Sequence, residues 1–241
     1  MENVYYSALT EEQQELYTGL AKKLKEQVLQ RVDEKGISGS QMSILDALLK
    51  LRQICCHPRL LKLDMPGVST NLSSGKFEAF KDLITTIVDD GHKVLVFSQF
   101  VQMLHIIRSW LSMNNIPFAY LDGASKDRFE QVDKFNNSPE IPIFLISLKA
   151  GGTGLNLTAA DYVIHYDPWW NPAVEDQATD RTHRIGQTKK VFSYKMICEN
   201  SVEEKILKLQ EQKKGVAEAI IPGQNAWKNL TRDDLEMLFE V

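Results

Sequence analysis

Residues 93–113 read KVLVFSQFVQMLHIIRSWLSM, an apolar run followed directly by an amphipathic pattern. The run Val94–Phe97 is apolar throughout, which is typical of a strand that is buried on both faces. Apolar residues then recur at the spacing of one helix face, at Val101, Leu104, Ile107 and Leu111. The stretch therefore predicts a buried strand followed by a helix that packs on the same core.

The same unit repeats along the chain. Further apolar runs predict strands at residues 118–121, 143–148, 162–166 and 191–197. Helical patterns cover residues 74–91 and 100–113, and a helix capped by Ser125 is predicted to bury Phe129, Val132 and Phe135. Strands that alternate with helices form a parallel sheet with both faces covered. We therefore expect an α/β fold, a parallel sheet flanked by helices.

The two ends of the chain read as helices. Thr10 and Gln13 form a capping box for a helix to about residue 32, followed by a loop over 36–40 and a second helix over about 41–54. Ser201 and Glu204 form another capping box, for a helix to about residue 221. A last helix is expected over 231–239. The fold is thus predicted to carry an N-terminal helical extension and C-terminal helices.

Composition excludes several classes of protein. The 241 residues are 43% hydrophobic and 25% charged, which is ordinary for a globular domain. The formal net charge of -4 argues against coating nucleic acid by bulk electrostatics, so any such contact needs a local strip of donors. No apolar run is long enough to span a bilayer and no secretory leader is visible, so we expect no membrane partner. Three cysteines without a disulfide pattern indicate a reducing compartment.

Functional groups of parallel sheets gather after the carboxyl ends of the strands. The loops that follow the predicted strands are residues 98–100, 122–125, 147–156 and 167–171. The loop 147–156 is rich in glycine, and its backbone N–H groups could form an anion-binding nest. Two tight turns joined by glycine are the alternative interpretation of that loop.

A helix is predicted between Pro172 and Gly186. Gln177, Arg181 and Arg184 fall at positions i, i+4 and i+7 and share one face. Guanidinium groups bind phosphate oxygens bidentately, so this face suits an anion. A solvated face, with the arginines paired to neighbouring aspartates, is the alternative.

Several other sites are not supported. Adjacent Cys55 and Cys56 cannot easily reach one tetrahedral ion with His57, so we expect no metal site. Gly75-Lys76 lacks the earlier glycine and the leading strand of a phosphate loop. The sequence contains phosphate-type donors without the loop that holds ATP, which is the pattern of half an active site.

Residues 176–187, DQATDRTHRIGQ, resemble motif VI of the SWI/SNF helicase-like ATPases of superfamily 2. KAGGTGLN at 149–156 resembles motif V of that family, and WNP at 170–172 resembles motif Va. VLVFSQF at 94–100 resembles motif IV, and LDG at 121–123 resembles the motif that follows it. LRQICCHP at 51–58 and SGK at 74–76 resemble blocks that lie upstream in the family. The resemblance covers nearly the whole chain and implies the second of two RecA-like lobes. In that family the two lobes clamp ATP between them and track along double-stranded DNA.

The resemblance implies roles for individual residues. Arg181 and Arg184 match the arginine fingers that reach the γ-phosphate across the cleft. The matching nucleotide-binding positions are Gln177, Gly152, Gly154 and Asn156. The matching DNA-binding positions are Ser98, Gly123, Ser125, Ser147, Lys149 and Trp170, with a core position the alternative for Trp170. ATP and Mg²⁺ would be held mainly by the first lobe, so these residues alone are expected to be inactive.

The resemblance also implies a domain plan and partners. We expect a helical protrusion and linker over 1–73, a RecA-like helicase C-terminal lobe over 74–200, and bracing helices over 201–241. Expected partners are double-stranded DNA, the N-terminal RecA-like lobe of the same polypeptide, and a DNA-bound protein such as a polymerase or nucleosome. The expected location is the cytoplasm or nucleoid in a prokaryote, or the nucleus in a eukaryote. A non-catalytic nucleic-acid or protein binding module and an RNA-acting superfamily 2 helicase stay open as alternatives.

Overall fold

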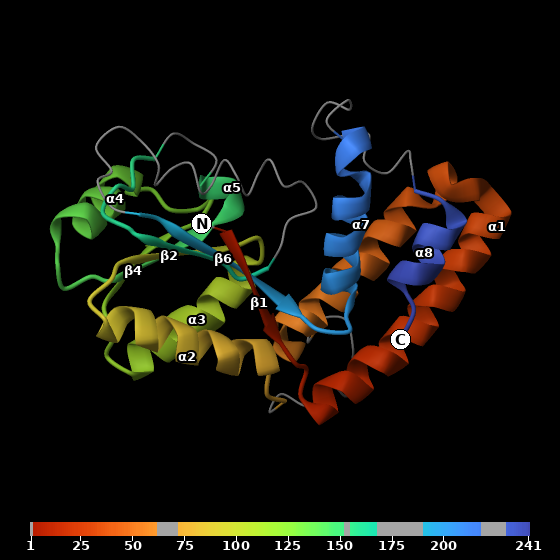
Figure 1. Cartoon of the computed structure of the whole chain (residues 1–241), viewed down its shortest axis with the longest axis horizontal. Helices are drawn as coiled ribbons and strands as arrows, with labels where there is room; N and C mark the ends of the chain where they lie inside the picture. The colour runs from red at the N-terminus through yellow and green to blue at the C-terminus, as the bar shows by residue number, and fades with distance from the viewer. Residues whose placement is uncertain (1, 62–71, 152–154, 168–189, 218–229) are drawn as a thin grey trace. The chain divides into compact units, whose positions relative to one another are not determined.

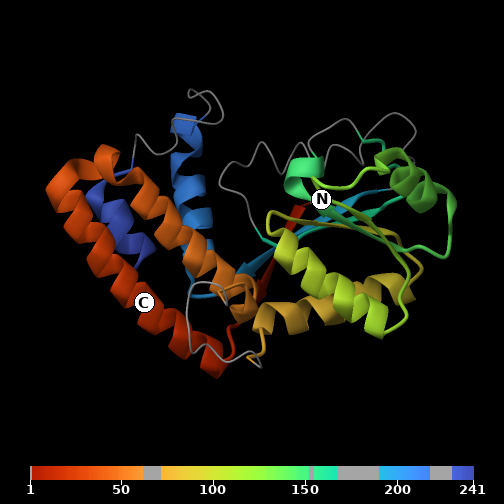
Figure 2. The ribbon, with the colours of Figure 1, turned by 180° about the vertical axis from the view of Figure 1, so that it is seen from behind.

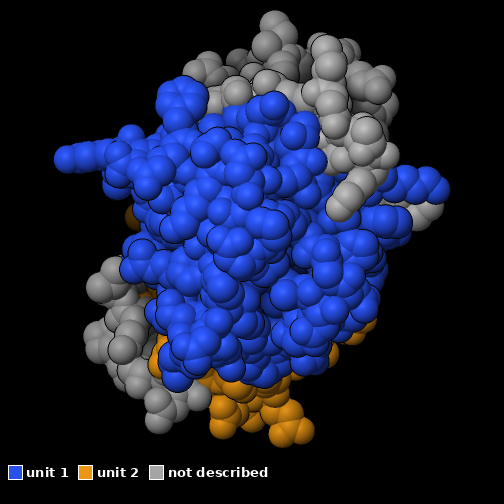
Figure 3. All heavy atoms as spheres, turned by 90° about the vertical axis from the view of Figure 1, so that its left-hand side faces the viewer, with its two compact units in different colours: residues 1–6, 78–197 blue, residues 7–77, 198–241 orange. Residues whose placement is uncertain are grey.

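The computed structural model describes residues 2–61, 72–151, 155–167, 190–217 and 230–241. The chain divides into two compact units, residues 1–6 with 78–197 and residues 7–77 with 198–241, which Figure 3 colours separately. No helix in the described ranges combines the length and the apolar character that a membrane crossing requires. The first unit holds the sheet, and the second holds the helices from both ends of the chain.

The first unit is built on a sheet in the order β1-β6-β5-β2-β4-β3 (Figure 1). The strands are β1 Glu2–Ser7, β2 Val94–Ser98, β3 Phe118–Leu121, β4 Ile143–Ser147, β5 Tyr162–His165 and β6 Phe192–Cys198. The pairs β2–β4, β2–β5, β3–β4 and β5–β6 are all parallel. Every residue of β2 and of β4 is buried, as strands in the middle of a covered parallel sheet must be. The predicted α/β class is confirmed.

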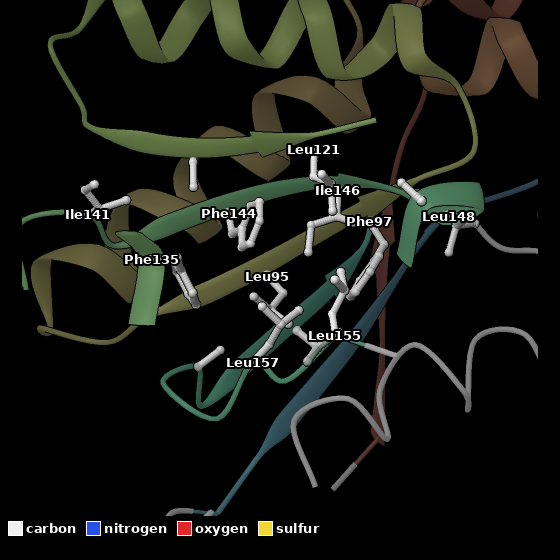
Figure 4. Close-up of a cluster of buried hydrophobic side chains, with 14 of the residues drawn as sticks. Leu95, Phe97, Leu121, Phe135, Ile141, Phe144, Ile146, Leu148, Leu155 and Leu157 are labelled. Carbon is white, nitrogen blue, oxygen red and sulfur yellow. The ribbon is translucent and has the colours of Figure 1, made fainter. Parts of the chain in front are cut away.

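Helices cover both faces of this sheet (Figures 1 and 2). Helices α2 Gly75–Asp89 and α3 Val101–Met113 lie on one side, and α4 Arg128–Asn137 and the short α5 Leu148–Gly151 lie on the other. On the second side Phe97, Phe144 and Ile146 of the sheet pack with Phe135 of α4 and Leu157 of the segment before β5 (Figure 4). This core holds the loops at the carboxyl ends of the strands on a rigid base.

The second unit contains α1 Glu11–Cys56, the short helix η1 Pro58–Leu61, α7 Val202–Ala217 and α8 Arg232–Leu238. The Gln13 N–H donates to Thr10 Oγ1 at 3.2 Å and the Thr10 N–H to Gln13 Oε1 at 3.3 Å, which confirms the capping box. Gly36 has φ 68° and ψ 170°, so α1 is two helices that meet at a kink. The sequence predicted both helices, but the expected loop over 36–40 is reduced to that one left-handed glycine.

The structure differs from the sequence prediction at several elements. Residues 2–7 form the edge strand β1, which no pattern had indicated. Helix α4 begins after Asp127 instead of at Ser125, because the Ser125 hydroxyl donates to Asp122. Phe129, predicted to be buried, is 87% exposed in the first turn of α4. The later part of that helix packs on the core, through Phe135 and the partly buried Val132.

Candidate functional site

The carboxyl ends of four parallel strands meet at one edge of the sheet. Ser98, the last residue of β2, lies opposite Ser147, the last residue of β4. The neighbouring strands β3 and β5 follow the same register and end at Leu121 and His165. The loops after these four strands therefore start side by side, where parallel sheets bind their ligands.

Asp167 organises the loop that follows β2. The Ser98 hydroxyl donates a hydrogen bond to Asp167 Oδ1, and the Gln99 N–H donates to Asp167 Oδ2 at 3.1 Å. Ser98 Oγ also accepts the Phe100 N–H at 3.1 Å. The side chains of Ser98 and Asp167 are buried. The hydroxyl that the sequence assigned to a DNA phosphate is thus engaged inside the protein, by a carboxylate to which sequence reasoning had given no role.

The loop after β3 is a tight turn held by Asp122. Its Oδ1 accepts the Ala124 N–H at 2.9 Å and the Ser125 hydroxyl at 3.0 Å. The Asp122 N–H donates to Ser125 Oγ at 3.0 Å, which closes the turn. Gly123, at its tip, is exposed, and a Cβ added there would meet nothing within 4 Å. Ser125 therefore shapes the turn, and Gly123 presents the backbone to solvent.

The same aspartate has a perturbed acidity. Burial opposes its charged form, but hydrogen bonds from the Tyr120 hydroxyl, the Ala124 N–H and Ser125 outweigh burial and hold the pKa of Asp122 below its ordinary 3.8. The Tyr120 hydroxyl donates to Asp122 Oδ2 at 2.9 Å. Burial, and then this hydrogen bond, raise the pKa of Tyr120. At neutral pH the turn is fixed by an ionised carboxylate.

The loop after β4 presents a cation. The Ala150 N–H donates to Ser147 Oγ at 3.3 Å, so the buried serine caps the short helix α5. Lys149, in that helix, is exposed. Further along the loop, Asn156 is exposed, and its carbonyl accepts Asn136 Nδ2 of α4 at 2.9 Å. Of the site residues predicted in this loop, Lys149 and Asn156 reach solvent and Ser147 does not.

The predicted nucleotide-binding face lies outside the described residues. This applies to Gly152, Gly154, Gln177, Arg181 and Arg184. Trp170, which was predicted to contact DNA, also lies outside the described residues. The described part of the site therefore consists of the turn at Gly123, the Ser98–Asp167 pair and the loop of Lys149.

A separate buried cluster lies in the second unit. Ligand atoms of Cys55, Cys198 and Glu203 lie within 4.8 Å of one another. The ammonium group of Lys76 lies 2.5 Å from Glu203 Oε2 and supplies a positive charge to this cluster. Burial raises the pKa of the Cys55 thiol well above its ordinary value, and it is the thiolate that binds metals. These residues therefore form a buried Lys76–Glu203 ion pair with the side chains of Cys55 and Cys198 beside it.

The upstream block around residue 57 packs as a helix end. The His57 N–H donates to the Gln53 carbonyl at 2.9 Å, and the His57 ring contacts Phe77 edge-on with 5.8 Å between ring centroids. The Ser74 hydroxyl donates to the Cys56 carbonyl at 2.9 Å. These contacts agree with the interpretation of this block as a helix end packed on its neighbour.

Comparison with known proteins gives consistent matches. The helicase conserved C-terminal domain matches residues 75–186. The putative ATP-dependent helicase/translocase YwqA of Bacillus subtilis is 39% identical over 247 residues, covering 99% of this chain and 26% of that protein. The chain spans 19% to 26% of the length of the first curated relatives that it matches.

Solved structures match the whole chain. The C-terminal domain of a Sulfolobus solfataricus SWI2/SNF2 ATPase is 34% identical with a TM-score of 0.74, covering 99% of this chain and 97% of that domain. The core of that ATPase in complex with double-stranded DNA is 36% identical with a TM-score of 0.78, covering 100% of this chain and 50% of that one. The RecA-like sheet predicted from the sequence is confirmed by these matches.

Proposed function

Because the chain belongs to the SWI2/SNF2 family of helicase-like ATPases and corresponds to the C-terminal lobe of that family, we propose that it is the second motor lobe of a DNA-dependent ATPase that translocates on double-stranded DNA. The observation that carries this proposal is the match over nearly all of a solved SWI2/SNF2 C-terminal domain, at 34% identity. Activity then belongs to the complete polypeptide, in which a first lobe holds ATP and Mg²⁺.

The described edge of the sheet suits contacts to a DNA backbone. Lys149 is exposed there, and Gly123 presents its backbone in a turn whose other polar groups bond to one another. An ammonium group and a backbone N–H both bind phosphate oxygens and recognise no base. Such contacts fit a motor that steps along any sequence.

The nucleotide-binding part of the proposal rests on the sequence motif. Arg181 and Arg184 would stabilise the charge that spreads over the transferred phosphoryl group, and Gln177 would line the same cleft. Gly152 and Gly154 would approach the nucleotide through their backbone, with Asn156 beside them. Trp170 would lie near the DNA groove. In this proposal the arginines complete a site whose ATP is bound by the other lobe.

The proposal is tested by ATP hydrolysis with and without a DNA duplex. The complete polypeptide should be stimulated by duplex DNA, whereas the 241-residue chain alone should turn over essentially no ATP. Robust hydrolysis by the isolated chain would contradict the division of the site between two lobes. Stimulation by RNA in place of DNA would support an RNA-acting helicase, and no turnover in either protein would support a non-catalytic binding module.

A further inference from the structure

The side chain of Gln99 carries an unusual polar atom at the edge of the sheet. Its Nε2 is buried and has no hydrogen-bond acceptor in the described part of the chain. The backbone of the same residue is fixed, because its N–H donates to Asp167 Oδ2 at 3.1 Å. Nearly all buried polar groups in folded proteins have a partner, so an unpaired amide at a candidate site calls for a reason.

An unpaired buried donor lowers the stability of a fold, and an apolar side chain of the same size would avoid that cost. Glutamine at this position is therefore not explained by the free protein alone. Polar groups that destabilise the free state are common where a ligand later supplies the missing partner. Gln99 follows β2 directly, so its amide lies beside the start of the loops described above.

The Ser98 hydroxyl cannot donate a hydrogen bond to a ligand without losing one that it makes inside the protein. Ser98 Oγ donates to Asp167 and accepts the Phe100 N–H, so both of its functions are filled inside the protein. Gln99 as a whole is only half-buried, and its side chain has three rotatable bonds. Its amide can therefore turn outward while its backbone stays fixed on Asp167.

We propose that the Gln99 amide, in place of the Ser98 hydroxyl, is the group of this loop that donates a hydrogen bond to a phosphate oxygen of duplex DNA. This inference rests on the proposed function, and it names a contact that the sequence motif assigned to Ser98. A hydrogen bond from a neutral amide positions the DNA backbone without adding a positive charge to the contact. It therefore differs from Lys149, whose contact releases a counterion and makes binding depend on salt.

The test uses the complete polypeptide with Gln99→Met, which keeps an unbranched side chain and removes the amide. The melting temperature without DNA should be unchanged or higher, because the unpaired donor is gone. The affinity for a fluorescent duplex of mixed sequence should fall about tenfold, as for the loss of one hydrogen bond to a charged group. The slope of affinity against salt concentration should stay as it was.

Two variants support the interpretation. Gln99→Glu has the same shape but offers only acceptors and a negative charge, so it should weaken duplex binding more than Gln99→Met does. Gln102→Met changes an exposed glutamine of α3 and should leave both melting temperature and affinity unchanged.

Several results would overturn the inference. A lower melting temperature for Gln99→Met means that the amide stabilises the free protein, whatever the affinity. Unchanged duplex affinity of Gln99→Met means that the amide does not contact DNA. Slower ATP turnover of this variant at saturating duplex would then indicate that the amide contacts the other lobe. If the unaltered protein itself fails to bind duplex DNA, the proposed function fails before this contact is tested.

Discussion

Lys76 Nζ lies 2.5 Å from Glu203 Oε2, and neither side chain is exposed to solvent. Glu203 Oε2 also accepts the Cys198 N–H at 2.9 Å, so one carboxylate oxygen joins the start of α2, the end of β6 and the first turn of α7. Burial alone would lower the pKa of Lys76, but the Glu203 carboxylate outweighs it and raises that pKa above its ordinary 10.5. The stability that is linked to the protonation of Lys76 is therefore fully present below about pH 10.5 and is lost as the pH rises through the raised pKa.

Removing one partner of this pair should destabilise the chain strongly. Lys76→Met leaves the Glu203 carboxylate buried without its cation, which typically costs about 3–5 kcal/mol of unfolding free energy. Urea unfolding followed by circular dichroism measures the loss. The matched control is Lys81→Met, whose half-buried side chain pairs with the exposed Glu78, a pair that should contribute less than about 1 kcal/mol.

The double variant Lys76→Met with Glu203→Met should recover most of that loss, because apolar groups of similar volume replace both charges. Equal unfolding free energies for Lys76→Met and the unaltered chain would contradict a buried ion pair at this position.

Two glycines should respond in opposite directions to substitution by alanine. A Cβ on Gly75 would lie 1.9 Å from the carbonyl oxygen of Ala8, so the backbone must move. We expect Gly75→Ala to lower the unfolding free energy by about 1–3 kcal/mol, as overpacking does. Gly19 lies within helix α1 with nothing within 4 Å of an added Cβ, so Gly19→Ala should raise it by about 0.5–1 kcal/mol. Chemical denaturation of both variants compares them, and a stability gain in Gly75→Ala would refute the close approach.

Local patterns were sufficient for most of the architecture. The four-residue apolar run Val94–Phe97 and the spaced apolar residues after it predict β2 and α3, because both signals lie within a few residues of each other. Thr10 and Gln13 mark the start of α1, since a capping box is a contact three residues apart. Gly36 marks its kink because a left-handed φ favours glycine.

Contacts between segments that are distant in the sequence could not be predicted from local patterns. The Ser98–Asp167 bond depends on β5 lying beside β2, and sequence order does not give strand order. Strand β1 depends on pairing at the edge of the sheet, next to β6. Phe129 has the spacing of a core residue, but it lies in the first turn of a helix whose later part makes the contact with the core. The motif matches placed the candidate residues in the loops that follow the strands, and the structure adds which of their described side chains are exposed to solvent.

The acidity of Asp122 should depend on Tyr120. Its folded pKa lies below 3.8, so the turn gains stability above pH 3.8 and loses it as the pH falls through the folded pKa. Tyr120→Phe removes the hydrogen bond to Oδ2 and should move the pKa of Asp122 back toward 3.8. Carboxyl chemical shifts in a pH titration measure this, with Tyr194→Phe as the matched control. A pKa of Asp122 that stays as low in Tyr120→Phe would show that the tyrosine bond is not a cause.

Lys149 should act on DNA through charge alone. Lys149→Ala in the complete polypeptide removes an exposed ammonium group, so duplex affinity should fall to a similar extent for different sequences. The slope of log affinity against log salt concentration should decrease by about one, as for one lost phosphate contact. Lys23→Ala, at an exposed position of α1, is the matched control. An unchanged slope for Lys149→Ala would remove this lysine from the proposed DNA contact.

Arg181 and Arg184 of motif VI should affect catalysis far more than DNA binding. In the complete polypeptide, Arg181→Ala or Arg184→Ala removes a cation that would stabilise the transferred phosphoryl group, a contribution of roughly 10³–10⁵ in rate. Duplex-stimulated ATP turnover should fall by that order, while duplex affinity stays within a few-fold. Arg232→Ala, at an exposed arginine that bonds Asp33 and Glu236, is the matched control and should keep full turnover. Full activity in both motif variants would refute their role as arginine fingers, and a parallel loss of duplex affinity would assign them to DNA instead.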